Sequence, residues 1–96
     1  MTTVRAIVED GSLPQLPRHV KLRFDQRRNR WIVLAPERVL MPDEIAVEIL
    51  KRCDGKTSVS AIVADLAAAY EAPAEEIGAD VAEMLQDLAD KGFVEL

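Results

Sequence analysis

Few residues in this 96-residue chain are suited to covalent or metal chemistry. It has one cysteine (Cys53), one histidine (His19) and four aromatic side chains. A single cysteine excludes an internal disulfide and any site built from several thiolates. No charged-then-apolar leader opens the chain, and no apolar run approaches about 18 residues. We therefore expect a cytoplasmic protein without a membrane span.

The composition is that of an ordinary globular domain. Ninety-six residues are enough for one domain and leave little room for a second. Hydrophobic residues make up 49% of the chain but aromatic residues only 4%. The core is therefore expected to consist mainly of Leu, Ile, Val and Ala side chains.

The net charge of −5 is unevenly distributed. Residues 1–48 hold eight Lys or Arg against seven Asp or Glu, which gives +1, and residues 49–96 hold four against ten, which gives −6. Proteins that bind duplex DNA usually present a basic face to the phosphates. The acidic second half therefore argues against nucleic acid as a partner.

The first half of the chain contains three candidate strands. Polar residues and prolines interrupt residues 1–17, which predicts a flexible tail or linker there and a domain over residues 18–96. Apolar and polar residues alternate from Val20 to Phe24, as in a half-buried strand. Residues 31–34 are apolar on both faces, and residues 38–41 form a short third run. The tight connections predict an antiparallel meander, with Asn29 able to take a positive φ in the first turn.

The second half changes to helical periodicity. The first apolar stripe is expected at Ile45, Ile49, Leu50 and Cys53, with Gly55 as the stop signal. The second helix begins after Ser58 as N-cap, and the third carries a buried stripe with acids around it. Their apolar stripes consist of Val59, Ile62, Val63, Leu66 and Tyr70, and of Ile77, Val81, Met84, Leu85 and Leu88. Phe93 and Val94 are expected to fold back. The order predicts an α+β, winged-helix-like fold, with a three-stranded antiparallel sheet followed by a three-helix bundle.

The residue types that carry out catalysis are scarce and poorly placed. His19 leads a strand, and Cys53 lies near a helix C-terminus, where the helix dipole disfavours a thiolate. The acids Glu76, Asp80 and Glu83 recur at helical spacing without a histidine, which is typical of a solvated face rather than a metal site. The basic residues 27–30 are interpreted as a solvated hairpin tip. We expect no catalysis, no cofactor and no metal.

Several short segments occur in a specific order along residues 17–96. They are Leu34-Ala35-Pro36-Glu37, Ile49-Leu50 ahead of Cys53-Asp54-Gly55, Ser58-Val59 ahead of Ile62, the pair Leu66 and Tyr70, and Asp80-Val81 ahead of Leu85, Leu88 and Gly92. Each segment alone is common. Their order and spacing resemble the pyrroloquinoline quinone biosynthesis protein D family (PqqD) and the wider group of related peptide-recognition elements.

The resemblance implies a binding function without catalysis. PqqD-like proteins bind the ribosomally made precursor peptide PqqA. They present this peptide to the radical S-adenosylmethionine enzyme PqqE, which crosslinks a Glu and a Tyr within it. The resemblance therefore implies PqqA and PqqE as partners, with neither nucleic acid nor membrane involved.

The residues supply a physical reason to expect strand addition. Lys21 and Arg23 guard the first strand, whereas the third strand has Arg38 as its only charge. An extended peptide could pair with this strand and place alternate side chains in a groove beside the third helix. The predicted peptide-binding residues are Glu37, Arg38, Val39, Leu40, Met41, Ile77, Asp80, Val81, Met84 and Leu85.

Two other functions remain open at this point. In a winged-helix DNA-binding domain the third helix would enter the major groove, but here it carries Asp80, Glu83 and Asp87. In a dimerising adaptor, the unguarded third strand would pair with its own copy. We expect a monomer, and an edge-strand dimer is the alternative.

Overall fold

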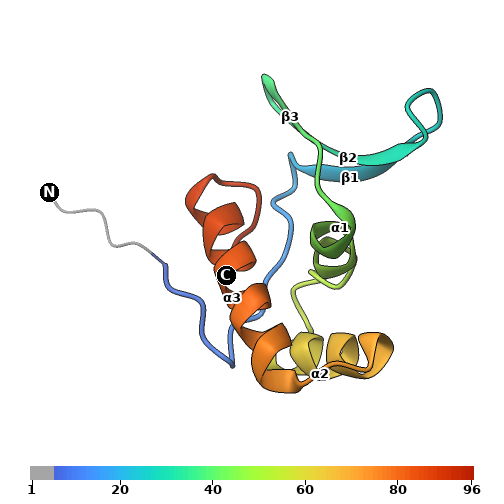
Figure 1. Ribbon diagram of the computed structural model, residues 1–96. Helices are drawn as coiled ribbons and strands as arrows, with labels where there is room; N and C mark the ends of the chain where they lie inside the picture. Colours follow the sequence, from blue (N-terminus) through green and yellow to red (C-terminus); the bar gives the residue numbers. More distant parts are fainter. Residues whose placement is uncertain (1–5) are drawn as a thin grey trace, which may run out of the picture.

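The computed structural model describes residues 6–96 and contains the predicted three strands and three helices. A three-stranded sheet lies at one end of the molecule, and α1 lies between this sheet and α2, while α3 runs along the side (Figure 1). The elements are β1 (Lys21–Asp25), β2 (Arg30–Ala35), β3 (Arg38–Leu40), α1 (Glu44–Lys51), α2 (Val59–Tyr70) and α3 (Ala74–Asp90). The α+β, winged-helix-like fold class is confirmed.

Two turns determine the register of the sheet. Strands β1 and β2 are antiparallel, with Phe24 opposite Trp31, and Asn29 in the turn between them has φ 53°, as predicted. Strand β3 pairs with β2 alone, through the two-residue turn Pro36-Glu37. Proline suits the first position of such a turn, and Glu37 takes φ 60° at the second. The order β1-β2-β3 leaves β1 and β3 as the two edges.

Side chains cap the first two helices. Asp43 accepts a hydrogen bond from the Ala46 amide at 2.8 Å, and Ser58 accepts one from the Ala61 amide at 3.2 Å. The predicted stop of the first helix at Gly55 is wrong, because α1 ends at Lys51 and Gly55 lies in the following turn at φ 78°. The Asp54 carboxylate closes that turn, because it accepts hydrogen bonds from the Lys56 and Thr57 amides at 2.8 Å each.

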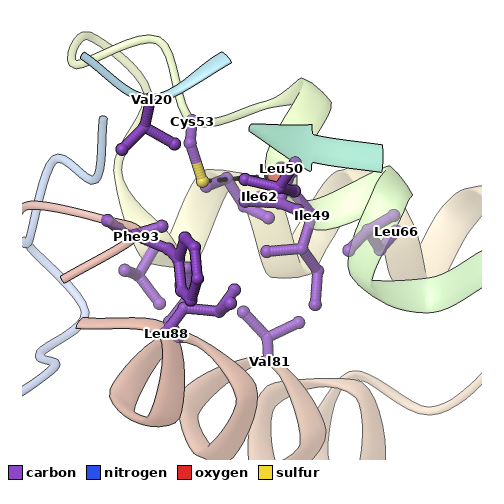
Figure 2. Packing of buried hydrophobic residues seen from close by; sticks show 13 residues of the cluster. Val20, Ile49, Leu50, Cys53, Ile62, Leu66, Val81, Leu88 and Phe93 are labelled. Carbon is purple, nitrogen blue, oxygen red and sulfur yellow. Dashed lines mark hydrogen bonds between the residues drawn. The ribbon is translucent and has the colours of Figure 1, made fainter. Parts of the chain in front are cut away.

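The core forms where the faces of the three helices converge with β2 and the C-terminal residues (Figure 2). Its members are almost all aliphatic, as expected: Val20, Val33, Ile49, Leu50, Cys53, Val59, Ile62, Leu66, Val81, Leu85, Leu88, Phe93 and Val94. The predicted fold-back of Phe93 and Val94 is confirmed. Two predicted core positions are wrong: Ile45 is 36% exposed and Tyr70 is 40% exposed. Ala46 and Val47 are buried instead, because they lie on the face of α1 that packs against the rest of the protein.

The segment before β1 is not a free tail over its described part. Gln15 pairs through its backbone with Glu95, at 2.9 and 2.8 Å, and Pro14 accepts a hydrogen bond from the Gly55 amide. Farther upstream, Ser12 accepts a bond from the Val59 amide. These bonds hold residues 12–15 against the helices, so the expected flexibility of residues 1–17 does not extend to them. Residues 1–5 lie outside the described residues.

Within residues 6–96, no helix combines the length and the apolar character needed to cross a bilayer.

Candidate functional site

Strand β3 is an exposed edge. No strand of the described chain pairs with its outer side. Val39 is 56% exposed, and Met41, which follows the strand, is 46% exposed. Leu40 between them is half-buried and packs against the core. An apolar strand with one side open can accept another extended segment.

The register indicates which backbone groups of this edge are available. Ala35 and Arg38 flank the two-residue turn, so they form the hydrogen-bonded kind of antiparallel pair. The two kinds of pair alternate along the strands. The pair Leu34–Val39 is therefore of the other kind, and the N–H and C=O of Val39 point away from β2. Leu40 points its own groups toward β2, because it follows Val39 by one residue.

The start of β3 contacts the residues that follow α3. At the start of the strand, Arg38 donates a hydrogen bond to the Lys91 carbonyl at 2.7 Å and lies 4.3 Å from the centre of the Phe93 ring. Beyond the strand's other end, Asp43 lines a hollow of about 670 Å³ together with residues of α3 that include Asp87. This groove lies between the start of α1 and α3, and no residue of β3 lines it, so a groove that continues the open edge stays a prediction.

The walls of this groove are more acidic than predicted. Its lining consists of Asp43, Ile45, Asp80, Glu83, Met84, Gln86, Asp87 and Asp90. Of these, Asp80 and Met84 belong to the predicted set. Glu83, Asp87 and Asp90 follow one another on α3 at spacings of four and three residues, a pattern that in sequence alone is typical of a solvated face. Asp43 and Ile45 were missed because they come from a different element.

The remaining predicted residues divide into exposed and buried groups. Glu37 lies exposed in the turn before β3, next to Arg38 and Val39. Val81 and Leu85 are 1% and 0% exposed, so they form the core behind the groove rather than its lining. Ile77 packs against that core and does not line the hollow. The candidate site therefore consists of the edge residues 37–41, with Asp80 and Met84 in the neighbouring groove.

Cys53 is unsuited to nucleophilic chemistry. Burial, and secondarily the charge of Asp54, raise the pKa of its thiol to about 12. Its Sγ donates to the Ile49 carbonyl at 3.2 Å, so the thiol is a satisfied core group (Figure 2). Among residues 6–96, no three His, Cys, Asp or Glu side chains are placed to hold a metal ion together.

Ion pairs on the helices shift two further pKa values. The hydrogen bond from Arg52 lowers the pKa of Glu48, and the bond to Asp65 raises that of Arg52. These three residues tie α1 to α2, away from the groove. Their role is structural.

These features define a class: a small winged-helix-like domain with one open strand edge and an acidic groove between α1 and α3. The family model for coenzyme PQQ synthesis protein D (PqqD) matches residues 30–94. A relative from Rhodopseudomonas palustris (strain BisB5), named "PqqA binding protein", is 62% identical over 94 residues, which cover 98% of this chain and 92% of the relative. The chain belongs to the PqqD family.

Two solved structures share the fold. One is the solution NMR structure of the PqqD truncation of Methylobacterium extorquens PqqCD, described as a functional, stand-alone recognition element for ribosomally synthesised and post-translationally modified peptides. It matches with a TM-score of 0.80 and 42% identity, over 96% of this chain and 97% of the other. The crystal structure of PqqD from Xanthomonas campestris matches with a TM-score of 0.60 and 39% identity, over 93% and 99%.

Proposed function

We propose that this chain binds the precursor peptide PqqA and presents it to the radical S-adenosylmethionine enzyme PqqE. The observation that carries the proposal is the open edge of β3, on which Val39 is 56% exposed. The names of the relatives support PqqA as the peptide. Because such peptides are made on ribosomes, we place this step in the cytoplasm.

Strand addition accounts for the binding physically. The peptide backbone pairs with the outward N–H and C=O of Val39, and its alternate side chains enter the groove beside Met84. Met84 is half-buried and flexible, so it can adapt to different peptide side chains. A few backbone hydrogen bonds and a small buried area correspond to a dissociation constant of roughly micromolar or somewhat tighter.

In this proposal the domain itself performs no chemistry. Its contribution is to hold an extended peptide in one register for a separate enzyme. The neutral, buried Cys53 supports this, since a thiol with a pKa of about 12 is not a nucleophile at neutral pH.

The edge also supports a second candidate, a dimer formed by two β3 strands. Val39 and Met41 are apolar and exposed, which favours self-pairing as well as peptide binding. Sedimentation velocity at two protein concentrations separates the two. A peptide-binding monomer keeps one sedimentation coefficient until PqqA is added, whereas a dimerising adaptor sediments faster at the higher concentration.

A titration with synthetic PqqA followed by NMR tests the proposed function. We expect the amide signals of Val39, Met41 and Met84 to shift, because they lie on the edge and the groove. Shifts confined to α2, or no shifts at millimolar peptide, would contradict it.

A further inference from the structure

A second surface lies at the other end of the sheet and has no part in the proposed peptide site. We call it the hairpin surface: Phe24 and Trp31 on the strands, Arg27, Arg28 and Arg30 at the turn, and Lys51 on α1. Phe24 is one of the two phenylalanines in the chain, and its side chain is 41% exposed. The hairpin projects from the body of the molecule beside the start of α1 (Figure 1).

The aromatic part of this surface is ordered by its own contacts. The rings of Phe24 and Trp31 meet edge to face, with 5.6 Å between their centres. The Lys51 ammonium lies over the Trp31 ring, 4.8 Å from its centre. Next to these rings is a hollow of about 520 Å³ between the hairpin and α1, with Val47 on its α1 wall.

The charged part is basic. Residues 24–31 hold three Arg and one Asp, which gives +2, although the whole chain carries −5. Asp25 fixes the turn by accepting the Arg27 amide at 2.9 Å, and it pairs with the Arg28 guanidinium at 3.0 Å. No carboxylate among residues 6–96 forms an ion pair with the side chain of Arg27 or Arg30. Two exposed guanidinium groups are therefore available to a partner.

We propose that the hairpin surface docks an acidic protein surface that carries an apolar side chain. Arginine and aromatic side chains together are enriched at protein interfaces, and the hollow offers a pocket for an apolar anchor. The inference rests on the proposed function, under which this acidic surface belongs to the enzyme that receives the peptide.

A folded protein fits this surface better than nucleic acid does. The α1 wall of the hollow carries Asp43, Glu44 and Glu48, opposite the arginines. A phosphate backbone would meet these carboxylates as like charges, whereas a protein surface can place acids against the hairpin and cations against α1.

The location also suits simultaneous binding. Asp43 lines both this hollow and the groove between α1 and α3, so the two hollows adjoin, and no residue of the β3 edge lines either of them. A peptide held on β3 would therefore lie next to whatever occupies the hairpin surface. This is the geometry that a presenting domain requires.

The experiment compares binding of two partners by two charge-reversal variants. Arg27→Glu/Arg30→Glu removes the unpaired arginines. The matched control, Arg18→Glu/Lys56→Glu, changes the net charge equally at two exposed positions outside the hairpin surface. Affinity for the radical S-adenosylmethionine enzyme, with PqqA present, and affinity for PqqA alone are measured by calorimetry. Circular dichroism melting verifies that each variant is folded.

We expect the hairpin variant to bind the enzyme at least about tenfold more weakly than the control at about 50 mM salt, with a smaller difference at about 500 mM. Both variants should bind PqqA alone within about twofold of the original chain, and Phe24→Ala should also weaken enzyme binding. Equal enzyme affinity for the two double variants would overturn the inference, as would tight binding of polyuridylate that depends on Arg27 and Arg30. Failure of the original chain to bind PqqA would instead contradict the proposed function.

Discussion

The two edges of the sheet differ in how they meet solvent. The β1 edge carries the exposed charges Lys21 and Arg23, which discourage a second chain from pairing. The β3 edge presents exposed Val39 and Met41, with Arg38 already engaged by the Lys91 carbonyl. The difference teaches that even a sheet of only three strands can have two chemically unlike edges, and we propose that the apolar one accepts the peptide.

The largest effect is expected from closing the open edge with proline. Val39→Pro removes the outward N–H and should weaken PqqA binding at least about 30-fold, or about 2 kcal/mol, with little loss of folding. Leu40→Pro removes an N–H directed at β2, so it should mainly lower the melting temperature. Calorimetry and thermal melting separate these effects. Normal PqqA affinity in a folded Val39→Pro variant would place the peptide elsewhere.

A charge in the groove should have the next largest effect. Met84→Asp adds a carboxylate beside Asp80 and Asp87 and removes an adaptable apolar contact, so PqqA affinity should fall about tenfold. Ala79→Asp is the control, because it adds the same charge at an exposed position of α3 outside the groove. Fluorescence anisotropy with labelled peptide measures both. If the two variants bind equally, Met84 does not contact the peptide.

Removing the exposed charges of β1 should make its edge as open to pairing as the edge of β3. Lys21→Val/Arg23→Val leaves β1 apolar, and we expect self-association that increases with concentration. The variant Lys21→Glu/Arg23→Glu keeps two charges on this edge, with the opposite sign, and should remain monomeric. Light scattering across a concentration series detects the change. A monomeric valine variant would show that something other than charge protects β1.

The smallest effect concerns the core thiol, which lies at neither edge. The folded pKa of Cys53, about 12, is above its ordinary value of 9.0. The neutral thiol's contribution is therefore fully present below pH 9 and is lost as the pH rises toward 12. We expect the free energy of unfolding to fall by about 1 kcal/mol by about pH 10, and by less in Cys53→Ala. Urea unfolding at several pH values measures this. At neutral pH, Cys53→Ala should bind PqqA with the same affinity as the original chain.

Local patterns were sufficient to predict the elements of the fold. The strand that ends near Phe24, the cap at Ser58 and the positive φ of Asn29 depend on near neighbours in sequence, and each was predicted correctly, although Phe24 itself is 41% exposed. The order of the segments that resemble the PqqD family also predicted the class of protein. The open third strand also followed from composition, because Arg38 is its only charge.

The errors came from contacts between residues far apart in sequence. Ile45 and Ala46 both fit a helical stripe, and only the position of α1 in the protein decides that Ala46 is the buried one. Val81 and Leu85 were expected at the groove, but the same positions face the core. The pairing of Gln15 with Glu95 joins two segments that are 80 residues apart in sequence, and no local pattern indicates it.

Amide hydrogen exchange with and without PqqA tests the central difference between the edges most directly. The account predicts that the exposed amides of Val39 and Met41 exchange freely in the chain alone and become protected by at least about tenfold when the peptide binds. The exchange rates of the β1 amides should not change. Protection at β1, with unchanged exchange at Val39 and Met41, would contradict the assignment of β3 as the binding edge.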